Sequence, residues 1–161
     1  MDIHIFWDGP HSYDGATKLT SGQDYGIYQI YGHHPLYGAD VLLYLGMAQA
    51  QTFGKRISQE GWLDRTDGLN IEVYVGRLAG RNKIAEEAWE ELIDHAEKLL
   101  IYSHLPALNT QSTKSLPEEN VMSHRIYNWG AHRDLFPEVS GYRFTSKFAH
   151  IGEEHIYRVE K

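Results

Sequence analysis

Two tyrosines, an arginine and a glutamate in this chain have the residue types and the surroundings of a reactive site. Tyr28 and Tyr44 each lie within two residues of a glycine, in the sequences GIY and YLG, and Arg56 follows twelve residues after Tyr44. Glycine allows close approach of the backbone and removes bulk beside a reactive hydroxyl group. Glu97 follows further along the chain, and a firmly held, partly desolvated carboxylate at that position would suit a metal ion.

The two tyrosines belong to segments with the composition of β-strands. Residues 25–31 (YGIYQIY) are rich in aromatic and β-branched residues, and residues 41–47 (VLLYLGM) are nearly all apolar, as in a central strand that is covered on both faces. The residues between them, 32–40, contain two glycines and a proline. These patterns predict a β-hairpin with a long loop, which would place the two tyrosines on neighbouring strands.

Arg56 and Glu97 fall on predicted helices. Residues 51–60 have weak helical character. Residues 83–104 form the clearest element of the chain, because apolar residues recur at i, i+3 and i+4 spacing. Glu97 lies at the edge of that apolar stripe, four residues after Ile93.

The remaining segments predict a mixed fold. Residues 70–79 alternate in polarity like a half-buried strand, and residues 2–7 resemble a short strand. In the last forty residues, 125–129 and 154–159 are candidate strands that either extend the sheet or cover the core. We therefore expect one α/β (α+β) domain over residues 1–161, with a mainly antiparallel sheet of three central strands flanked by helices.

Composition sets limits on location and on partners. The chain has no cysteine, which excludes a disulfide framework and thiolate zinc sites, and no run of apolar residues long enough for a membrane span. It has no basic leader followed by an apolar run, so we expect a cytoplasmic protein. Its formal net charge is −7, which opposes nucleic-acid binding unless positive charge is concentrated locally or supplied by a protein partner or second subunit.

Four sequence motifs, in order, resemble the GIY-YIG nuclease family. They read GIYQIY, LYLG, FGKRI and AEKLLIYSHLPALNTQ, and a single GIY triplet would mean little without the other three. The resemblance covers residues 25–110, the motif core, and leaves residues 111–161 as a C-terminal extension. It places the family's two tyrosines on Tyr28 and Tyr44, its arginine on Arg56, its metal-binding glutamate on Glu97 and its asparagine on Asn109.

The resemblance implies a metal-dependent endonuclease that hydrolyses phosphodiester bonds in DNA, with RNA a less favoured substrate. Glu97 would hold one mostly hydrated Mg²⁺ or Mn²⁺ ion, and Arg56 would donate to the phosphate oxygens. Tyr28 would act as general base or position the water, with nearby cations such as Arg56, Lys55 or the metal ion favouring its phenolate form. Tyr44 would orient the water or the phosphate, and Asn109 would bond to backbone and steady the site.

Other interpretations of the same residues remain open. Taken one at a time, Tyr28 and Tyr44 are ordinary strand aromatics, and Glu97 is one of several carboxylates on a charged helix. The chain also departs from the family pattern, because Glu60 stands where some members have a histidine one turn after the arginine. The alternative function is a catalytically silent binding module, or a subunit of a nucleic-acid-processing complex.

Overall fold

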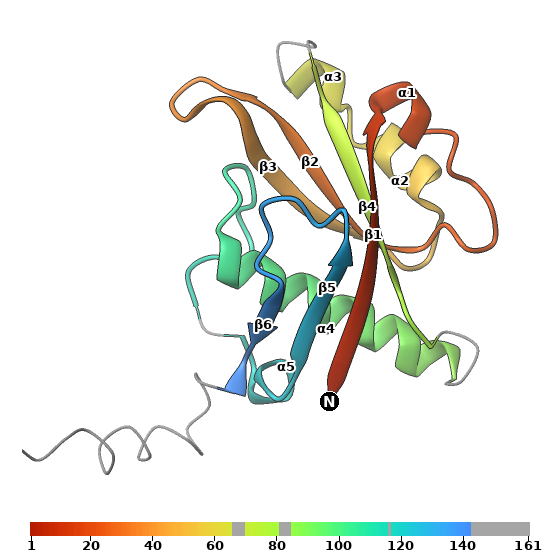
Figure 1. Cartoon of the computed structure of the whole chain (residues 1–161), viewed down its shortest axis with the longest axis vertical. Coiled ribbons are helices and arrows are strands. Elements are labelled where there is room, and N and C mark those ends of the chain that lie inside the picture. The colour runs from red at the N-terminus through yellow and green to blue at the C-terminus, as the bar shows by residue number, and fades with distance from the viewer. Residues whose placement is uncertain (66–69, 81–84, 116, 143–161) are drawn as a thin grey trace, which may run out of the picture.

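The sheet of this protein extends well beyond the predicted three strands. In the computed structural model, which describes residues 1–65, 70–80, 85–115 and 117–142, six strands form one sheet in the order β3-β2-β4-β1-β5-β6 (Figure 1). The strands are β1 (Asp2–Ser12), β2 (Gly26–His34), β3 (Gly38–Ala48), β4 (Glu72–Leu78), β5 (Arg125–Gly130) and β6 (Glu138–Ser140). The helices are α1 (Tyr13–Ala16), α2 (Phe53–Gln59), α3 (Trp62–Arg65), α4 (Glu86–His104) and α5 (Glu119–Met122). The α+β class is confirmed, whereas the expected number of strands is wrong.

The β2–β3 hairpin has a shorter connection than the sequence predicted. The two strands pair from Gly26↔Ala48 to His34↔Gly38, with two irregularities in register, so only residues 35–37 connect them. The predicted loop over residues 32–40 is therefore wrong. Backbone groups keep pairing through the irregularities because a local register shift costs less than leaving the remaining N–H and C=O groups unpaired.

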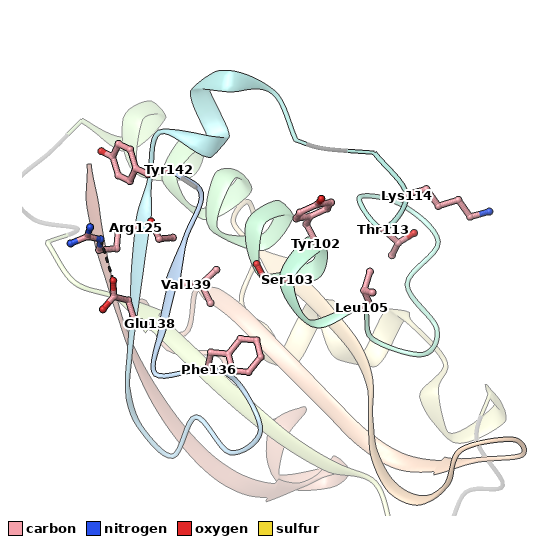
Figure 2. Close-up of a pocket in the computed structure, with 11 residues that line it drawn as sticks. Tyr102, Ser103, Leu105, Thr113, Lys114, Arg125, Phe136, Glu138, Val139 and Tyr142 are labelled. Carbon is pink, nitrogen blue, oxygen red and sulfur yellow. Dashed lines mark ion pairs between the residues drawn. The ribbon is translucent and has the colours of Figure 1, made fainter. Parts of the chain in front are cut away.

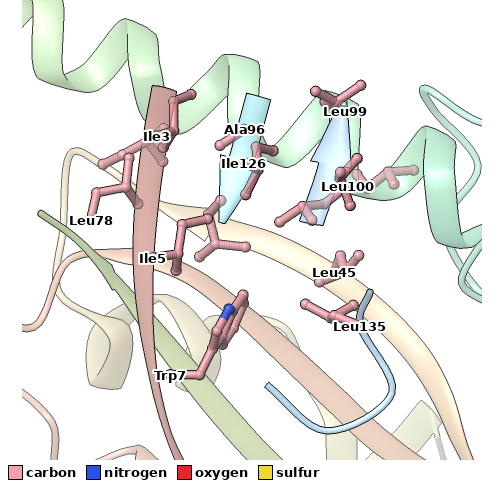
Figure 3. Close-up of a cluster of buried hydrophobic side chains, with 14 of the residues drawn as sticks. Ile3, Ile5, Trp7, Leu45, Leu78, Ala96, Leu99, Leu100, Ile126 and Leu135 are labelled. Carbon is pink, nitrogen blue, oxygen red and sulfur yellow. The ribbon is translucent and has the colours of Figure 1, made fainter. Parts of the chain in front are cut away.

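The two faces of the sheet bury different clusters. Alternate residues of a strand point to opposite faces, and Ile27 and Tyr31 of β2 pack in the cluster that includes α4, whereas Tyr28 and Ile30 pack in the cluster that includes α2 and α3. Figure 3 shows the first cluster, with Leu99 of α4 above the sheet. The apolar stripe predicted for this helix is thus the face that it presents to the sheet.

The C-terminal part of the described chain extends the sheet. Strand β5 runs parallel to β1, from Asp2↔Arg125 to Trp7↔Gly130, and β6 pairs with β5 in antiparallel orientation. A buried hydrogen bond of 2.8 Å from Trp7 Nε1 to Asn128 Oδ1 joins these two distant segments. Helix α5 precedes β5 in the chain, and the candidate strand over residues 154–159 lies outside the described residues.

None of the helices in the described ranges is long and apolar enough to cross a membrane. Helix α4, of nineteen residues, is the longest of them and carries charged residues on its outer side, among them Glu86, Glu87 and Glu91.

Leu99 offers a direct test of this core. Its side chain is fully buried between α4 and the sheet, so Leu99→Ala should lower the free energy of unfolding by about 2–5 kcal/mol through lost burial and a residual cavity. The control is Leu36→Ala in the hairpin connection, where the leucine is 78% exposed and its removal should change stability by less than about 0.5 kcal/mol. Urea denaturation measures both, and equal effects of the two substitutions would contradict this packing.

Candidate functional site

The two motif tyrosines lie side by side on the β2–β3 hairpin. Tyr28 is paired across the strands with Gly46, and the ring centroids of Tyr28 and Tyr44 are 6.1 Å apart. A Cβ atom at Gly46 would lie 2.6 Å from Tyr28 Oη and 2.6 Å from the Tyr44 ring. Because Gly46 has no side chain, the Tyr28 phenol can occupy the space above it. Tyr28 on one strand therefore requires a glycine at the opposite position on the other.

Arg56 reaches this hairpin from α2. Phe53 and Ile57 of the same helix are buried in the cluster that contains Tyr28, which places Arg56 at the edge of the cluster. Its guanidinium forms an ion pair with Glu60, 2.6 Å from Nη2 to Oε1. Burial lowers the pKa of Arg56, but its interactions with Tyr28 and Glu60 outweigh burial and raise it overall, so Arg56 is a permanent cation beside the tyrosine.

Glu97 approaches β3 from α4, the helix on the other face of the sheet, and lies close enough to Arg56 for the two charges to interact. Burial raises its pKa to about 7, with a smaller contribution from the charge of Asp94. Arg56 and Lys98 act in the opposite direction, as does a hydrogen bond from the backbone N–H of Met47 on β3. Near neutral pH the Glu97 carboxyl group therefore binds a proton about half of the time, which a metal ion would have to displace.

Tyr28 is the point at which these elements meet. Its side chain is fully buried, and its Oη atom has no hydrogen-bond partner within the described part of the chain. Burial raises the pKa of Tyr28 well above its ordinary value, and Tyr44, Glu60 and Glu97 raise it further, whereas Arg56 lowers it. Residues of β3, α2 and α4 thus lie close enough for their charges to act on one phenol.

One expectation about Tyr28 needs correction. Of the cations expected to favour its phenolate form, Arg56 lowers the pKa of Tyr28, but burial raises that pKa by more. Lys55, the neighbour of Arg56 on α2, has an exposed side chain. In the protein without bound ligands, Tyr28 is therefore a neutral phenol at neutral pH, because desolvation disfavours the charged form.

Asn109 bonds to backbone, as the sequence analysis expected. Its side-chain amide accepts from Leu45 N and donates to Leu45 O, both at 2.9 Å. The backbone N–H groups of Ala107 and Leu108 also donate to β3, at Leu42 O and Leu43 O. These hydrogen bonds hold the segment after α4 along the edge of β3 that faces away from β2. The Met47 N–H group that bonds to Glu97 belongs to the same strand.

The donor set fits a hydrated metal ion better than a fully protein-bound one. The described residues contain no group of three or more His, Cys, Asp or Glu side chains that could hold a metal. Glu97 is a single, partly desolvated carboxylate whose charge acts on Tyr28, and Mg²⁺ held by so few protein ligands keeps most of its water ligands. Glu97 is the residue that would hold such an ion.

One cavity lies away from these residues. It has a volume of about 840 Å³ and lies between the end of α4 and the β5–β6 strands, with Tyr102, Lys114, Phe136 and Tyr142 on its walls (Figure 2). None of the five predicted site residues lines it. This cavity is therefore separate from the candidate site, which lies at the β3 edge of the sheet and is identified by its side chains.

Two arrangements were not predicted from the sequence. Glu60 was noted as a departure from the family pattern, but its ion pair with Arg56 was not predicted. The burial of His95, with its Nδ1 atom 3.0 Å from His124 Nε2, was not predicted either. The spacing of Arg56 and Glu60, four residues apart on a helix, was the signal for the first, and His124 is too distant in sequence to signal the second.

Gly46→Ala should disrupt the candidate site. The added methyl group would meet Tyr28 Oη and the Tyr44 ring at 2.6 Å, so one or both phenols must move, at a cost of about 1–3 kcal/mol in stability. Gly22→Ala is the control, because a Cβ atom there meets nothing within 4 Å. Urea denaturation and tyrosine near-ultraviolet circular dichroism measure the effect, and a Gly46→Ala protein with unchanged stability and spectrum would contradict this arrangement.

Glu97→Gln should stabilise the protein in a pH-dependent way. The folded-state pKa of about 7 lies above the ordinary value of 4.5. Between these two values the unfolded chain loses the proton and the folded chain keeps it, so wild-type stability falls as pH rises through this window. The uncharged glutamine avoids this penalty, and we expect a gain of about 1–3 kcal/mol near pH 8 that vanishes near pH 4.

Urea denaturation at several pH values measures this gain. Glu87→Gln, an exposed position on the same helix, is the control and should show no such trend. A Glu97→Gln protein with wild-type stability at every pH would show that Glu97 is not desolvated.

No family model, curated protein or solved structure matches this chain.

Proposed function

We propose that this protein is a metal-dependent endonuclease that hydrolyses phosphodiester bonds in DNA. The observation that carries the proposal is that the Tyr44 ring lies next to the Tyr28 ring, and that Arg56 and Glu97, from α2 and α4, lie close enough for their charges to act on the Tyr28 phenol. A phenol pair, a guanidinium and a desolvated carboxylate at one place are the groups that hydrolysis of a phosphodiester needs.

Arg56 is the group that would bind the scissile phosphate. Its planar fork of N–H donors matches two phosphate oxygens, and its charge offsets the negative charge that grows in the transition state. It lies at the rim of a buried cluster and its side chain is 37% exposed, so a phosphate can reach it from solvent while its other side faces Tyr28.

Glu97 is the group that would hold a divalent cation. When bound, that cation would supply positive charge that neutralises the phosphate and the departing oxygen. Because burial raises the pKa of Glu97 to about 7, the cation competes with a proton, and its apparent affinity should increase with pH up to that value. Burial also keeps the carboxylate in one position.

Tyr28 and Tyr44 would position the attacking water. Hydrolysis forms a P–O bond from water and breaks the P–O ester bond, and the water must lose a proton while the leaving oxygen gains one. The Tyr28 hydroxyl is buried and has no hydrogen-bond partner of good geometry within the described part of the chain, so a water molecule bound beside it would supply the partner that a buried phenol needs. With its pKa raised by burial, Tyr28 is a hydrogen-bond donor before a cation binds and an acceptor of the proton only once added positive charge favours its phenolate form.

Asn109 would act as a positioning residue. It holds both backbone groups of Leu45, the residue between Tyr44 and Gly46. It therefore holds the β3 backbone in position next to Gly46, against which the Tyr28 phenol packs. This role requires no contact with substrate.

The net charge of −7 bears on the partners. A DNA substrate needs positive surface for most of its affinity, so we propose that a protein partner or a second subunit supplies it, in the cytoplasm, with RNA a less favoured substrate. The same charge favours the second candidate function, a catalytically silent binding module in a nucleic-acid-processing complex, and retention of both Arg56 and Glu97 favours the enzyme.

Plasmid nicking tests the proposal. Wild-type protein should nick supercoiled plasmid with Mg²⁺ or Mn²⁺ and not with EDTA. Arg56→Gln and Glu97→Gln should each reduce the rate about 100-fold or more, the loss typical of removing one group that stabilises transition-state charge. Glu87→Gln, an exposed position on the same helix as Glu97, should retain wild-type activity. Wild-type inactivity on single-stranded, duplex and branched DNA would favour the binding module, and cleavage that survives Glu97→Gln would contradict the assigned metal site.

A further inference from the structure

The arginine of the candidate site is already paired with a carboxylate. Arg56 Nη2 lies 2.6 Å from Glu60 Oε1, and the Glu60 side chain is only 11% exposed. The charge of Glu60 also acts on the pKa of Tyr28, so this carboxylate faces the site and not the solvent. A phosphate that approaches Arg56 therefore has to compete with the Glu60 carboxylate for the guanidinium.

Helix stability does not explain why Glu60 occupies this position. It is the C-cap residue of α2, where a negative charge meets the negative end of the helix dipole. The pair also has the arginine before the glutamate, and the reverse order is the more stabilising one at i, i+4 spacing. A lysine, glutamine or asparagine would suit this helix end better, so the carboxylate is better explained by what it does to Arg56.

The local charges would repel a phosphodiester when no cation is bound. Arg56 contributes one positive charge, Glu60 cancels it, and Glu97 adds a negative charge whenever its carboxyl group is ionised. The sum is zero or negative. Like charges brought together at a partly desolvated place cost several kcal/mol, whereas a divalent cation held by Glu97 would make the sum of these charges positive.

We propose that Glu60 withholds Arg56 from phosphate until a divalent cation is bound, so that binding of a nucleic-acid phosphate at this site depends on the cation. This inference rests on the proposed function, since it concerns the same site. Glu60 is a positioning residue that acts through Arg56. With a cation held by Glu97, the hold of Glu60 on the guanidinium would weaken, and one edge of the Arg56 fork would then be free to bind the phosphate.

Binding in EDTA tests this inference without relying on catalysis. Fluorescence anisotropy of a short labelled DNA duplex would compare wild-type protein with Glu60→Gln, which keeps the size of the side chain and removes its charge. We expect Glu60→Gln to bind about tenfold more tightly in EDTA, the order of effect that one like charge near a phosphate produces at a protein surface. The double variant Glu60→Gln/Arg56→Gln should lose this gain, because the gain requires the released guanidinium.

A matched control removes a charge from another ion pair. Glu138→Gln makes the same change in net charge and releases Arg125, which pairs with Glu138 at 3.2 Å on β5 and β6, away from the site. Its affinity in EDTA should stay within about twofold of wild type. Equal gains for Glu60→Gln and Glu138→Gln would show an effect of net charge alone and overturn the proposal, as would the absence of any gain for Glu60→Gln.

Metal binding separates the remaining alternative, in which Glu60 is itself a metal ligand. Mn²⁺ affinity, measured by titration calorimetry, should fall strongly in Glu97→Gln and stay near wild type in Glu60→Gln. A comparable loss in both variants would overturn the proposal. These binding results are independent of plasmid nicking. If the protein is inactive but its Glu60→Gln variant gains binding through Arg56, the nuclease proposal is contradicted and the role of Glu60 is supported. If wild-type protein is active but Glu60→Gln gains no binding, the nuclease proposal is supported and the role of Glu60 is contradicted.

Discussion

The candidate site depends on strand β3, which in the described residues is the terminal strand of the sheet and therefore pairs with another strand on one side only. One side of β3 pairs with β2, and its other side has backbone groups that need partners from elsewhere. Asn109 takes both groups of Leu45, and the Met47 N–H group donates to Glu97. The same two strands carry Tyr28 and Tyr44, so satisfying this edge brings α4 and the segment after it to the phenol pair.

Burial then determines the protonation of the site. Glu97 and Tyr28 both have raised pKa values because desolvation disfavours their charged forms. The positive charge of Arg56, which would counteract this, is shared with Glu60. Without bound ligands the site is therefore close to neutral, and it has the desolvated carboxylate and the buried hydroxyl that added positive charge would activate. This state is consistent with an enzyme whose chemistry waits for a cation.

Local patterns predicted the elements that carry the site, and long-range pairing determined the rest of the fold. The periodicity of residues 83–104 indicated α4, and the composition of residues 25–31 and 41–47 indicated the hairpin, because each pattern is contained within one element. The six-stranded sheet was not predictable in the same way. Strand β5 pairs with β1 across more than a hundred residues, and a parallel pair of that kind has no turn between its strands to signal it.

The sequence by itself determined which side chains were candidates and in what order they occur, from Tyr28 to Asn109. It determined that Gly46 lies close to a tyrosine, but only the tertiary structure showed that the tyrosine needing this glycine is Tyr28 on the other strand. The i, i+4 spacing of Arg56 and Glu60 allowed their ion pair, but only the tertiary structure decided that this pair lies beside Tyr28 and that Tyr28 stays a neutral phenol. The physical reason is that pKa values and ion pairs depend on distance and desolvation, which are properties of the packed chain and not of residue order.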